Sequence, residues 1–445
     1  MAETPHDNET SSRQPKMNTY WTTRFFYGWV IVVVVFIAEF VASGMGILTI
    51  GLFFTPIKES MGWSLTQLTG AVTAQGIAAM LIAPFIGPAI DRFGARIVML
   101  FGAVSASLGM IFLARIEEFW QLWVLFAVVG ALGLHELGNL TGPVVISKWF
   151  VRRRGRAMAL ATTGTVIGAM TMTPIIGLLI SNVGWREAWQ YMGISVLVIT
   201  LLPVAIFMRS RPEDVGLLPD GDGQQRFTQT TSSQNPQSKS YATEHSWTLK
   251  QALCTRSLWL IVISMNLASL AASVQIVHTA PFLTQQEGLS TSVASFIIMA
   301  RLTVAAVSRI PWGLLVERIP VRFCLALTFS IRAFGLLSMV IFPFPIYLPV
   351  FVIFSGMGTS LGLLQPMVFA NYFGREFQGT IQGFMRPFLA GPGLAVPLIA
   401  AILFDATGTF DIAFLVMTIP GLLAVPLILL AKPPTPNSPT PRPIN

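Results

Sequence analysis

Eight ionisable side chains lie inside long apolar stretches of this chain, where charged groups are rare. An ionisable side chain at bilayer depth costs about 2.5 to 3.5 kcal/mol even on lenient insertion scales. Each of these residues is therefore expected to have either a partner or a chemical task. They are Glu39, His135, Glu136, His278, Arg301, Arg309, Arg332 and Arg386.

The arginines among them favour binding of a carboxylate. A guanidinium donates two parallel charge-assisted hydrogen bonds and stays protonated in nearly any environment. Arg301 and Arg309 are eight residues apart, so on a helix they lie on a similar face, about 12 Å apart along the axis. We predict that Arg309, Arg301 and Arg386 bind an anionic substrate. The alternative for Arg309 is a structural ion pair with a glutamate of the first or fourth apolar stretch.

The acidic residues and histidines are candidates for proton coupling. Burial favours the neutral form of a carboxyl group, whereas a nearby arginine favours the ionised form. Glu39 and Glu136 are therefore either proton carriers or members of static ion pairs. His135 and His278 titrate near neutral pH and are further candidates, although a lone histidine in an apolar helix more often serves as a hydrogen-bonding residue.

The composition of the 445-residue chain excludes a single soluble domain. Apolar residues make up 53% of the chain and charged residues only 11%, and the mean hydropathy is +0.67; soluble domains contain about 25% charged residues. Long unbroken apolar runs exclude the alternating strands of a membrane barrel. We predict an all-α polytopic membrane protein with twelve spans, at 27–52, 67–90, 96–115, 119–146, 157–181, 187–208, 258–283, 291–315, 322–343, 346–370, 379–404 and 409–431.

Lys and Arg residues are distributed unevenly around these spans. With the N-terminus inside, 21 of the 28 fall in inner segments, whereas only Lys58, Arg115 and Arg186 fall in outer loops. Because cytoplasmic loops retain positive charge during insertion, both termini are predicted to be cytoplasmic, with the protein in the plasma (cell inner) membrane. The net charge of +8 then indicates anionic lipid, and not nucleic acid, as its partner.

The only long polar stretch, residues 209–257, divides the spans into two sets of six. The first 26 residues contain no apolar core of a signal peptide, so the first span is expected to act as the insertion signal. The predicted organisation is a cytoplasmic N-tail (1–26), an N-terminal six-helix domain (27–208), a cytoplasmic linker (209–257), a C-terminal six-helix domain (258–431) and a cytoplasmic C-tail (432–445).

An internal repeat supports this division. Residues of the same kind and spacing follow the second and the eighth span: Gly87, Asp91, Arg92 and Arg96, then Gly313, Glu317, Arg318 and Arg322. Two duplicated halves joined by a linker are typical of transporters that bind substrate near the midplane, between the halves.

The first copy of the repeat, G-x-x-x-D-R-x-G-x-R at 87–96, resembles the signature loop of the major facilitator superfamily, and 313–322 resembles a degenerate second copy. In that family these loops border a cytoplasmic gate that opens as the halves rock. The resemblance implies that the gate residues are Asp91, Arg92, Arg96, Glu317, Arg318 and Arg322; the alternative is that these charges only fix topology. It also implies that Arg332 lies on a supporting helix and is structural.

Further motifs are similar to those of the monocarboxylate transporter and oxalate/formate antiporter branch. They include Tyr27-Gly28-Trp29, the run 53–57, Trp149-Phe150 followed by Arg153-Arg154-Gly155, Gly184-Trp185-Arg186 and the run 211–217. The resemblance spans about residues 25–432. It implies a secondary transporter of small organic anions with proton coupling or anion exchange, in which Arg309 binds the carboxylate.

The chain departs from this branch at its proton relay. Ala305 stands where proton-coupled relatives have an aspartate, and only apolar residues surround Ile47 and Leu48, where they have a lysine. The departure favours exchange of one anion for another, or coupling through Glu39.

Other functions have weaker support. An exporter of drug-like or amphipathic compounds is the alternative, but the span 157–181 lacks the contiguous Gly-Pro and Gly-Gly pairs of such proton antiporters. An enzyme is not expected, because there is no metal-ligand cluster, nucleophile motif or nucleotide-binding loop, and no cofactor is expected. A non-transporting sensor would bind a ligand without flux. The expected partners are a small organic anion, lipid, and protons or a counter-anion, and a monomer suffices for this architecture.

Overall fold

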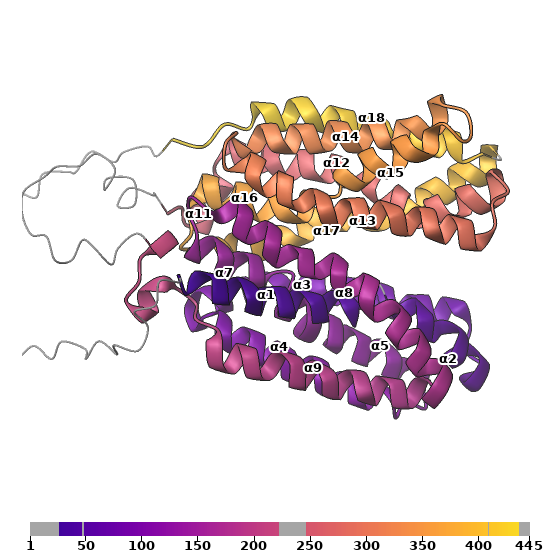
Figure 1. The fold of residues 1–445 in the computed structure, drawn as a ribbon, viewed down its shortest axis with the longest axis horizontal. Coiled ribbons are helices and arrows are strands. Elements are labelled where there is room, and N and C mark those ends of the chain that lie inside the picture. Colours follow the sequence, from indigo (N-terminus) through magenta and orange to yellow (C-terminus); the bar gives the residue numbers. More distant parts are fainter. Residues whose placement is uncertain (1–25, 47–48, 222–245, 408, 436–445) are drawn as a thin grey trace, which may run out of the picture.

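The computed structural model describes residues 26–46, 49–221, 246–407 and 409–435, which form helices joined by short turns (Figure 1). Within these ranges there is no strand, and ten helices are long and apolar enough to cross a membrane. The predicted all-α class is therefore confirmed. Ile47, Leu48, most of the two predicted tails and the middle of the linker lie outside the described residues.

The helices form two bundles that lie side by side (Figure 1). The first bundle contains α1 (Gly28–Gly44), α2 (Phe54–Met61), α3 (Leu65–Phe93), α4 (Ala95–Leu113), α5 (Phe119–Val128), α6 (His135–Leu137), α7 (Thr141–Trp149), α8 (Arg154–Val183) and α9 (Trp185–Phe207). The second contains α12 (Arg256–Pro281), α13 (Thr291–Val316), α14 (Val321–Ile341), α15 (Tyr347–Met357), α16 (Leu361–Phe373), α17 (Gln378–Thr407) and α18 (Phe410–Leu430). A short helix, α11 (Leu249–Leu253), precedes the second bundle.

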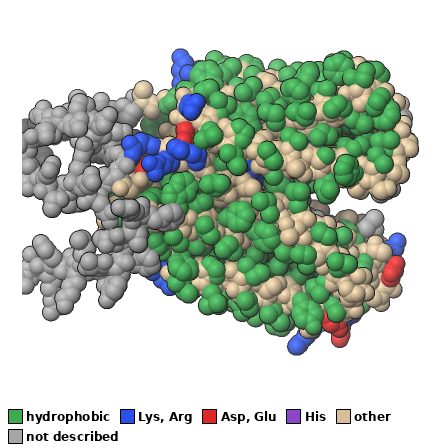
Figure 2. All heavy atoms as spheres, viewed as in Figure 1, with side chains coloured by type: hydrophobic (Ala, Val, Ile, Leu, Met, Phe, Trp, Pro, Cys, Tyr) green, Lys and Arg blue, Asp and Glu red, His purple; other side chains and the backbone are tan. Residues whose placement is uncertain are grey.

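Large apolar side chains cover the outside of both bundles. Phe85, Ile276 and Phe296 are 77%, 70% and 67% exposed, and charged side chains gather at the two ends of the bundles (Figure 2). Soluble monomers rarely expose so large an apolar surface, whereas lipid would cover it favourably.

Local sequence signals set several helix ends. Ser64 accepts a hydrogen bond from the backbone N–H of Gln67, and the Gln67 side chain accepts one from the backbone N–H of Ser64, so the start of α3 is a capping box. Gly94 follows α3 with a φ of 85°, a conformation that favours glycine, and turns the chain into α4.

Three of the twelve predicted spans are broken helices. The first ends at Gly44 and is followed by a 3-10 turn at 50–53; the fourth contains a π-helix, η3 (Val129–Leu134), and a turn at 138–140; the tenth turns at 358–360, between α15 and α16. Glycines allow the close packing around the second break, because a Cβ on Gly133 would lie 2.8 Å from Ala106 Cα. Irregular backbone at membrane depth is tolerated where protein surrounds it.

The two bundles contact each other mainly through two helix pairs, α3 with α17 and α8 with α13. A Cβ on Gly379 would lie 2.6 Å from the carbonyl oxygen of Gly87, and one on Gly313 would lie 2.6 Å from that of Gly155. We call the end of the molecule that holds these contacts, together with residues 209–221 and α11, the linker end. At the opposite end Figure 2 shows a notch between the bundles.

Candidate functional site

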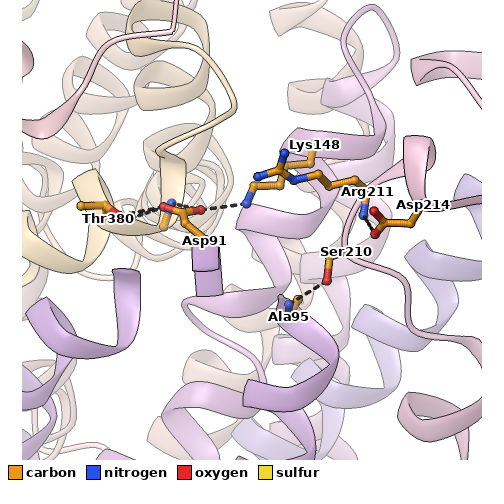
Figure 3. A network of polar contacts seen from close by, with 8 residues as sticks. Asp91, Ala95, Lys148, Ser210, Arg211, Asp214 and Thr380 are labelled. Atoms are coloured by element: carbon orange, nitrogen blue, oxygen red, sulfur yellow. Dashed lines mark hydrogen bonds and ion pairs between the residues drawn. The ribbon is translucent and has the colours of Figure 1, made fainter. Parts of the chain in front are cut away.

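At the linker end, Asp91 joins the two bundles (Figure 3). Its carboxylate accepts hydrogen bonds from Lys148 Nζ (2.7 Å) in its own bundle and from the backbone N–H (2.7 Å) and hydroxyl (2.9 Å) of Thr380 in the other. Thr380 lies in the first turn of α17, where unpaired N–H groups and the helix dipole attract an anion. Only 10% of the Asp91 side chain and 5% of the Lys148 side chain are exposed, so water screens this ion pair weakly.

Glu317 makes a second junction of the same kind. Its two carboxylate oxygens accept hydrogen bonds from the backbone N–H and the Nε of Arg156, both at 2.9 Å. Glu317 follows α13 in the second bundle, and Arg156 lies in the first turn of α8 in the first bundle. The repeat seen in the sequence therefore places two carboxylates at two helix N-termini, each across the boundary between the bundles.

Two further arginines complete the junction. Arg154, buried at the start of α8, donates hydrogen bonds to the carbonyl oxygens of Phe150 (2.9 Å) and Ser147 (3.1 Å) and to Asn371 Oδ1 (2.6 Å) of the second bundle. Arg375, in the loop before α17, donates to the carbonyl oxygen of Lys148 (3.2 Å) and pairs with Glu213 (3.0 Å). Ser210 of the same linker segment accepts a hydrogen bond from the backbone N–H of Ala95 (2.9 Å) in the first bundle, so the first part of the linker contacts both bundles.

The six predicted gate residues separate into two groups. Asp91 and Glu317 bridge the bundles. The other four are arginines at the surface of the linker end, where Arg92, Arg96 and Arg318 are exposed and Arg322 is half-buried. Arg92 and Arg322 lie over the rings of neighbouring phenylalanines, at 5.3 and 4.9 Å from the ring centroids.

Sequence reasoning missed the basic partners at the linker end. It treated Lys148, Arg156 and Arg375 only as topology signals, and Arg154 only as a topology signal and part of a family motif. The Trp149 to Gly155 motif, which contains Arg154 and lies directly between Lys148 and Arg156, was the signal that could have found three of them.

In the middle of the molecule, Glu39 of α1 is 2% exposed and accepts a hydrogen bond from the Thr165 hydroxyl of α8 at 3.1 Å. Arg309 of α13 and Arg386 of α17 both interact electrostatically with Glu39 from the other bundle. Arg309 also donates a hydrogen bond across the boundary, to the carbonyl oxygen of Thr162. Two predicted substrate-binding arginines therefore interact electrostatically with a predicted coupling carboxylate across the boundary, although among the described residues neither forms an ion pair with it.

Glu136 and His135 lie in α6, next to the helix break that follows η3. Glu136 is fully buried, and within the described part of the chain neither of its carboxylate oxygens has a hydrogen-bond partner. Its electrostatic partner is Arg386, which also interacts with His135. Arg386 therefore interacts electrostatically with three buried residues of the first bundle, Glu39, Glu136 and His135.

The remaining predicted residues lie elsewhere. His278 is 8% exposed and packs on the ring of Phe410, 5.6 Å between ring centroids, at the end of α12 away from the linker end. Arg301 interacts with Arg332 of α14 in its own bundle, not with the glutamates. Among the described residues no group of three or more His, Cys, Asp or Glu residues could hold a metal ion.

Comparisons with known proteins agree with this architecture. A sequence model of the Major Facilitator Superfamily matches residues 31–393. The chain resembles the outward conformation of the transporter FucP with a TM-score of 0.70 at 12% identity, covering 91% of this chain and 98% of that one.

Three relatives illustrate the sequence similarity. The chain is 23% identical to monocarboxylate transporter 12 of Rattus norvegicus over 422 residues, which cover 91% of this chain and 85% of the relative. It is 26% identical to monocarboxylate transporter 7 of Homo sapiens over 186 residues (41% and 35%), and 26% identical to the oxalate:formate antiporter of Oxalobacter formigenes over 160 residues (36% and 37%). The last two matches span about a third of each relative's length.

These matches are to transporters, not to enzymes, and they fit the apolar surface and the paired bundles. The protein therefore belongs to the Major Facilitator Superfamily, and within it the chain is similar to monocarboxylate transporters and an oxalate:formate antiporter.

Proposed function

We propose that this protein is a secondary active transporter of small organic anions that works by alternating access. In this proposal twelve spans form two six-helix halves, 27–208 and 258–431, and both termini and the linker (209–257) are on the cytoplasmic side of the plasma membrane. The excess of Lys and Arg at the linker end supports this orientation. The junctions of Asp91 and Glu317 then close the cytoplasmic side, and the notch between the bundles faces outward.

The observation that carries the proposal is that Arg309 and Arg386 of the second bundle interact electrostatically with Glu39 of the first, and that Arg309 donates a hydrogen bond to the carbonyl oxygen of Thr162 across the boundary. A substrate carboxylate that entered from the notch would compete with Glu39 for these guanidiniums. It would find donors suited to bidentate binding in a site of low dielectric, where such bonds are strongest. Both arginines belong to the second bundle and Glu39 belongs to the first. Binding of a substrate carboxylate to the arginines in place of Glu39 would therefore remove an electrostatic attraction between the two halves.

We assign coupling to Glu39 and Glu136. Glu136 has no hydrogen-bond partner in the described structure, and a buried carboxyl without partners costs least when it is neutral. Protonation of Glu136 would remove a charge that competes for Arg386, and this would leave the arginine available to an anion. In an anion exchanger the counter-anion would take the place of the proton in this cycle.

For the alternative, an exporter of amphipathic compounds, the described residues offer an apolar recess. The recess has a volume of about 520 Å³ and lies among Met45, Met172, Ile176, Tyr191 and Val198. Its lining comes only from the first bundle, so rocking of the bundles would not carry its contents across the membrane.

Uptake into proteoliposomes tests the proposal. Vesicles loaded with unlabelled formate, oxalate, lactate or pyruvate should accumulate the labelled form of at least one of them, and a sugar such as fucose should not accumulate. Accumulation that follows an imposed pH gradient would indicate proton symport, whereas accumulation that requires internal anion would indicate exchange. Absence of flux for every carboxylate, with flux of an amphipathic cation, would replace the proposal with the exporter.

A further inference from the structure

We propose that the second bundle contains an additional anion-binding site, built by Arg301 of α13 and Arg332 of α14 and separate from the Arg309 and Arg386 site. Sequence reasoning predicted substrate binding for Arg301 and a structural role for Arg332. In the structure the two arginines interact electrostatically, and among the described residues neither is paired with a counter-charge.

Both guanidinium side chains are buried near the middle of membrane-spanning helices. Arg301 is 9% exposed and Arg332 is 7% exposed. Arg301 lies about 15 Å along α13 from its first residue, and Arg332 lies about 17 Å along α14 from its first residue. These positions are beyond the reach of the polar headgroups for side chains that point into the bundle.

Among the described residues, neither arginine has a protein partner that would satisfy its charge. The Nε of each is buried without a hydrogen-bond partner, and within the described part of the chain neither guanidinium forms a hydrogen bond or an ion pair. The charged neighbour of Arg332 is Arg301, a like charge. An unpaired buried charge is costly, and two like charges side by side are more costly still.

The helix α15 holds the two arginines in place. Gly356 packs against the backbone of Arg301, since a Cβ there would lie 2.8 Å from the Arg301 carbonyl oxygen. Gly358 packs against Arg332, whose Cβ would lie 2.7 Å from a Cβ at that glycine. These glycines stand at the break between α15 and α16, so the end of α15 lies between the two arginine-bearing helices. This close packing fixes the positions of Arg301 and Arg332 on either side of the end of α15.

A compact anion would satisfy this arrangement. Two guanidiniums present up to ten N–H donors in planar forks, which suit either a small carboxylate or a halide. Both of these ligands are small, singly charged anions that accept hydrogen bonds. Its source is either the transported carboxylate, which would then occupy a second position, or chloride from the medium.

Thermal unfolding of the purified full-length protein in detergent tests the proposal. Sodium chloride, sodium formate and sodium gluconate are compared at equal ionic strength, with gluconate as the bulky anion. We expect chloride, formate or both to raise Tm above its value in gluconate, by roughly 5 °C at saturation. Stabilisation by formate alone would identify the carboxylate as the source, and stabilisation by chloride would identify the inorganic ion.

Variants test whether the two arginines bind the anion. The rise in Tm should be retained by Arg115→Gln, which changes an exposed arginine, and lost by Arg301→Gln and Arg332→Gln. In gluconate, Arg332→Gln should unfold at or above the temperature of the unmodified protein, because it removes a buried repulsion. If a glutamine variant does not fold, Arg332→Lys supplies the comparison, and it should require more anion for half of the stabilisation because it loses the fork.

Two results would overturn the proposal. One is that no small anion stabilises the protein more than gluconate does. The other is that the stabilisation survives in both Arg301→Gln and Arg332→Gln. Transport through Arg309 and Arg386 is decided separately, by flux of labelled carboxylates into proteoliposomes, so failure of the two proposals can be distinguished.

Discussion

Asp91 and Glu317 occupy equivalent positions in the two halves of this protein, and each accepts hydrogen bonds from the first turn of a helix in the opposite half. Asp91 binds Thr380 of α17, and Glu317 binds Arg156 of α8. A carboxylate at a helix N-terminus is stabilised by the unpaired N–H groups and by the helix dipole. The linker end is therefore held by two related junctions, and the loss of one should leave the other.

Replacing Asp91 with Asn should weaken the closed linker end. The substitution removes the charge that Lys148 and the start of α17 share, and a hydrogen bond to a charged group contributes about 1.5 to 3 kcal/mol. We expect the population open at the linker end to rise about 10- to 100-fold. Pulsed EPR distances between spin labels at Arg96→Cys and Arg318→Cys, in a Cys254→Ser background, measure this population. Glu376→Gln changes an exposed carboxylate nearby and should leave the distances unchanged.

Replacing Gly313 with Ala should open the same end without altering charge. The added methyl group would lie 2.6 Å from the carbonyl oxygen of Gly155 and 3.1 Å from its carbonyl carbon, and backbone atoms cannot move aside cheaply. The matched control is Gly177→Ala in α8, where no atom lies within 4 Å of the new methyl group. The same spin-label pair should report longer distances for Gly313→Ala only. Equal distances for both variants would show that the close packing does not hold this end shut.

The linker contributes to stability through Asp220. Its buried carboxylate accepts hydrogen bonds from the backbone N–H groups of Val151 (3.1 Å), Arg152 (2.8 Å) and Arg153 (3.2 Å), immediately before α8. We expect Asp220→Ala to lower the free energy of unfolding by about 1 to 3 kcal/mol, because three donors lose their acceptor. Asp214→Ala removes one exposed hydrogen bond and should cost less than about 1 kcal/mol. Thermal unfolding in detergent compares the two, and equal losses would refute the assigned role of Asp220.

Replacing Glu136 with Gln should separate coupling from transport. Glutamine fits the same space but cannot exchange a proton, so we expect the response of uptake to a pH gradient to disappear. Exchange between equal concentrations of anion on both sides should continue. Glu39→Gln should instead alter affinity, because Glu39 interacts with both arginines. If Glu136→Gln keeps its full response to the gradient, Glu136 is not the proton carrier.

The sequence predicted the helical class, because hydrophobicity determines it. The repeated charged motif also singled out Asp91 and Glu317, which bind residues of the opposite bundle in the structure, and their role as gate residues stays a prediction. The sequence did not predict the helix breaks at η3 and at Gly358, since these depend on glycines that meet a neighbouring helix. From their spacing along α13, the sequence also predicted that Arg301 and Arg309 bind the same substrate, because spacing does not show which other helix each side chain contacts. The structure separates them, because Arg309 contacts α8 across the boundary whereas Arg301 meets Arg332 within its own bundle. A helical pattern shows which residues share one face of a helix, but it does not show which other helix packs against that face.

The central claim is that Arg309 and Arg386 bind the carboxylate of a transported anion. Counterflow of labelled formate or oxalate into proteoliposomes tests it most directly, with Arg309→Gln and Arg386→Gln compared with Arg115→Gln, and with circular dichroism to confirm that each variant is folded. Loss of a bidentate hydrogen-bonded pair should lower initial uptake at low substrate at least about tenfold in the first two variants, and uptake by Arg115→Gln should match that of the unmodified protein. Undiminished carboxylate uptake by folded Arg309→Gln and Arg386→Gln would contradict the account.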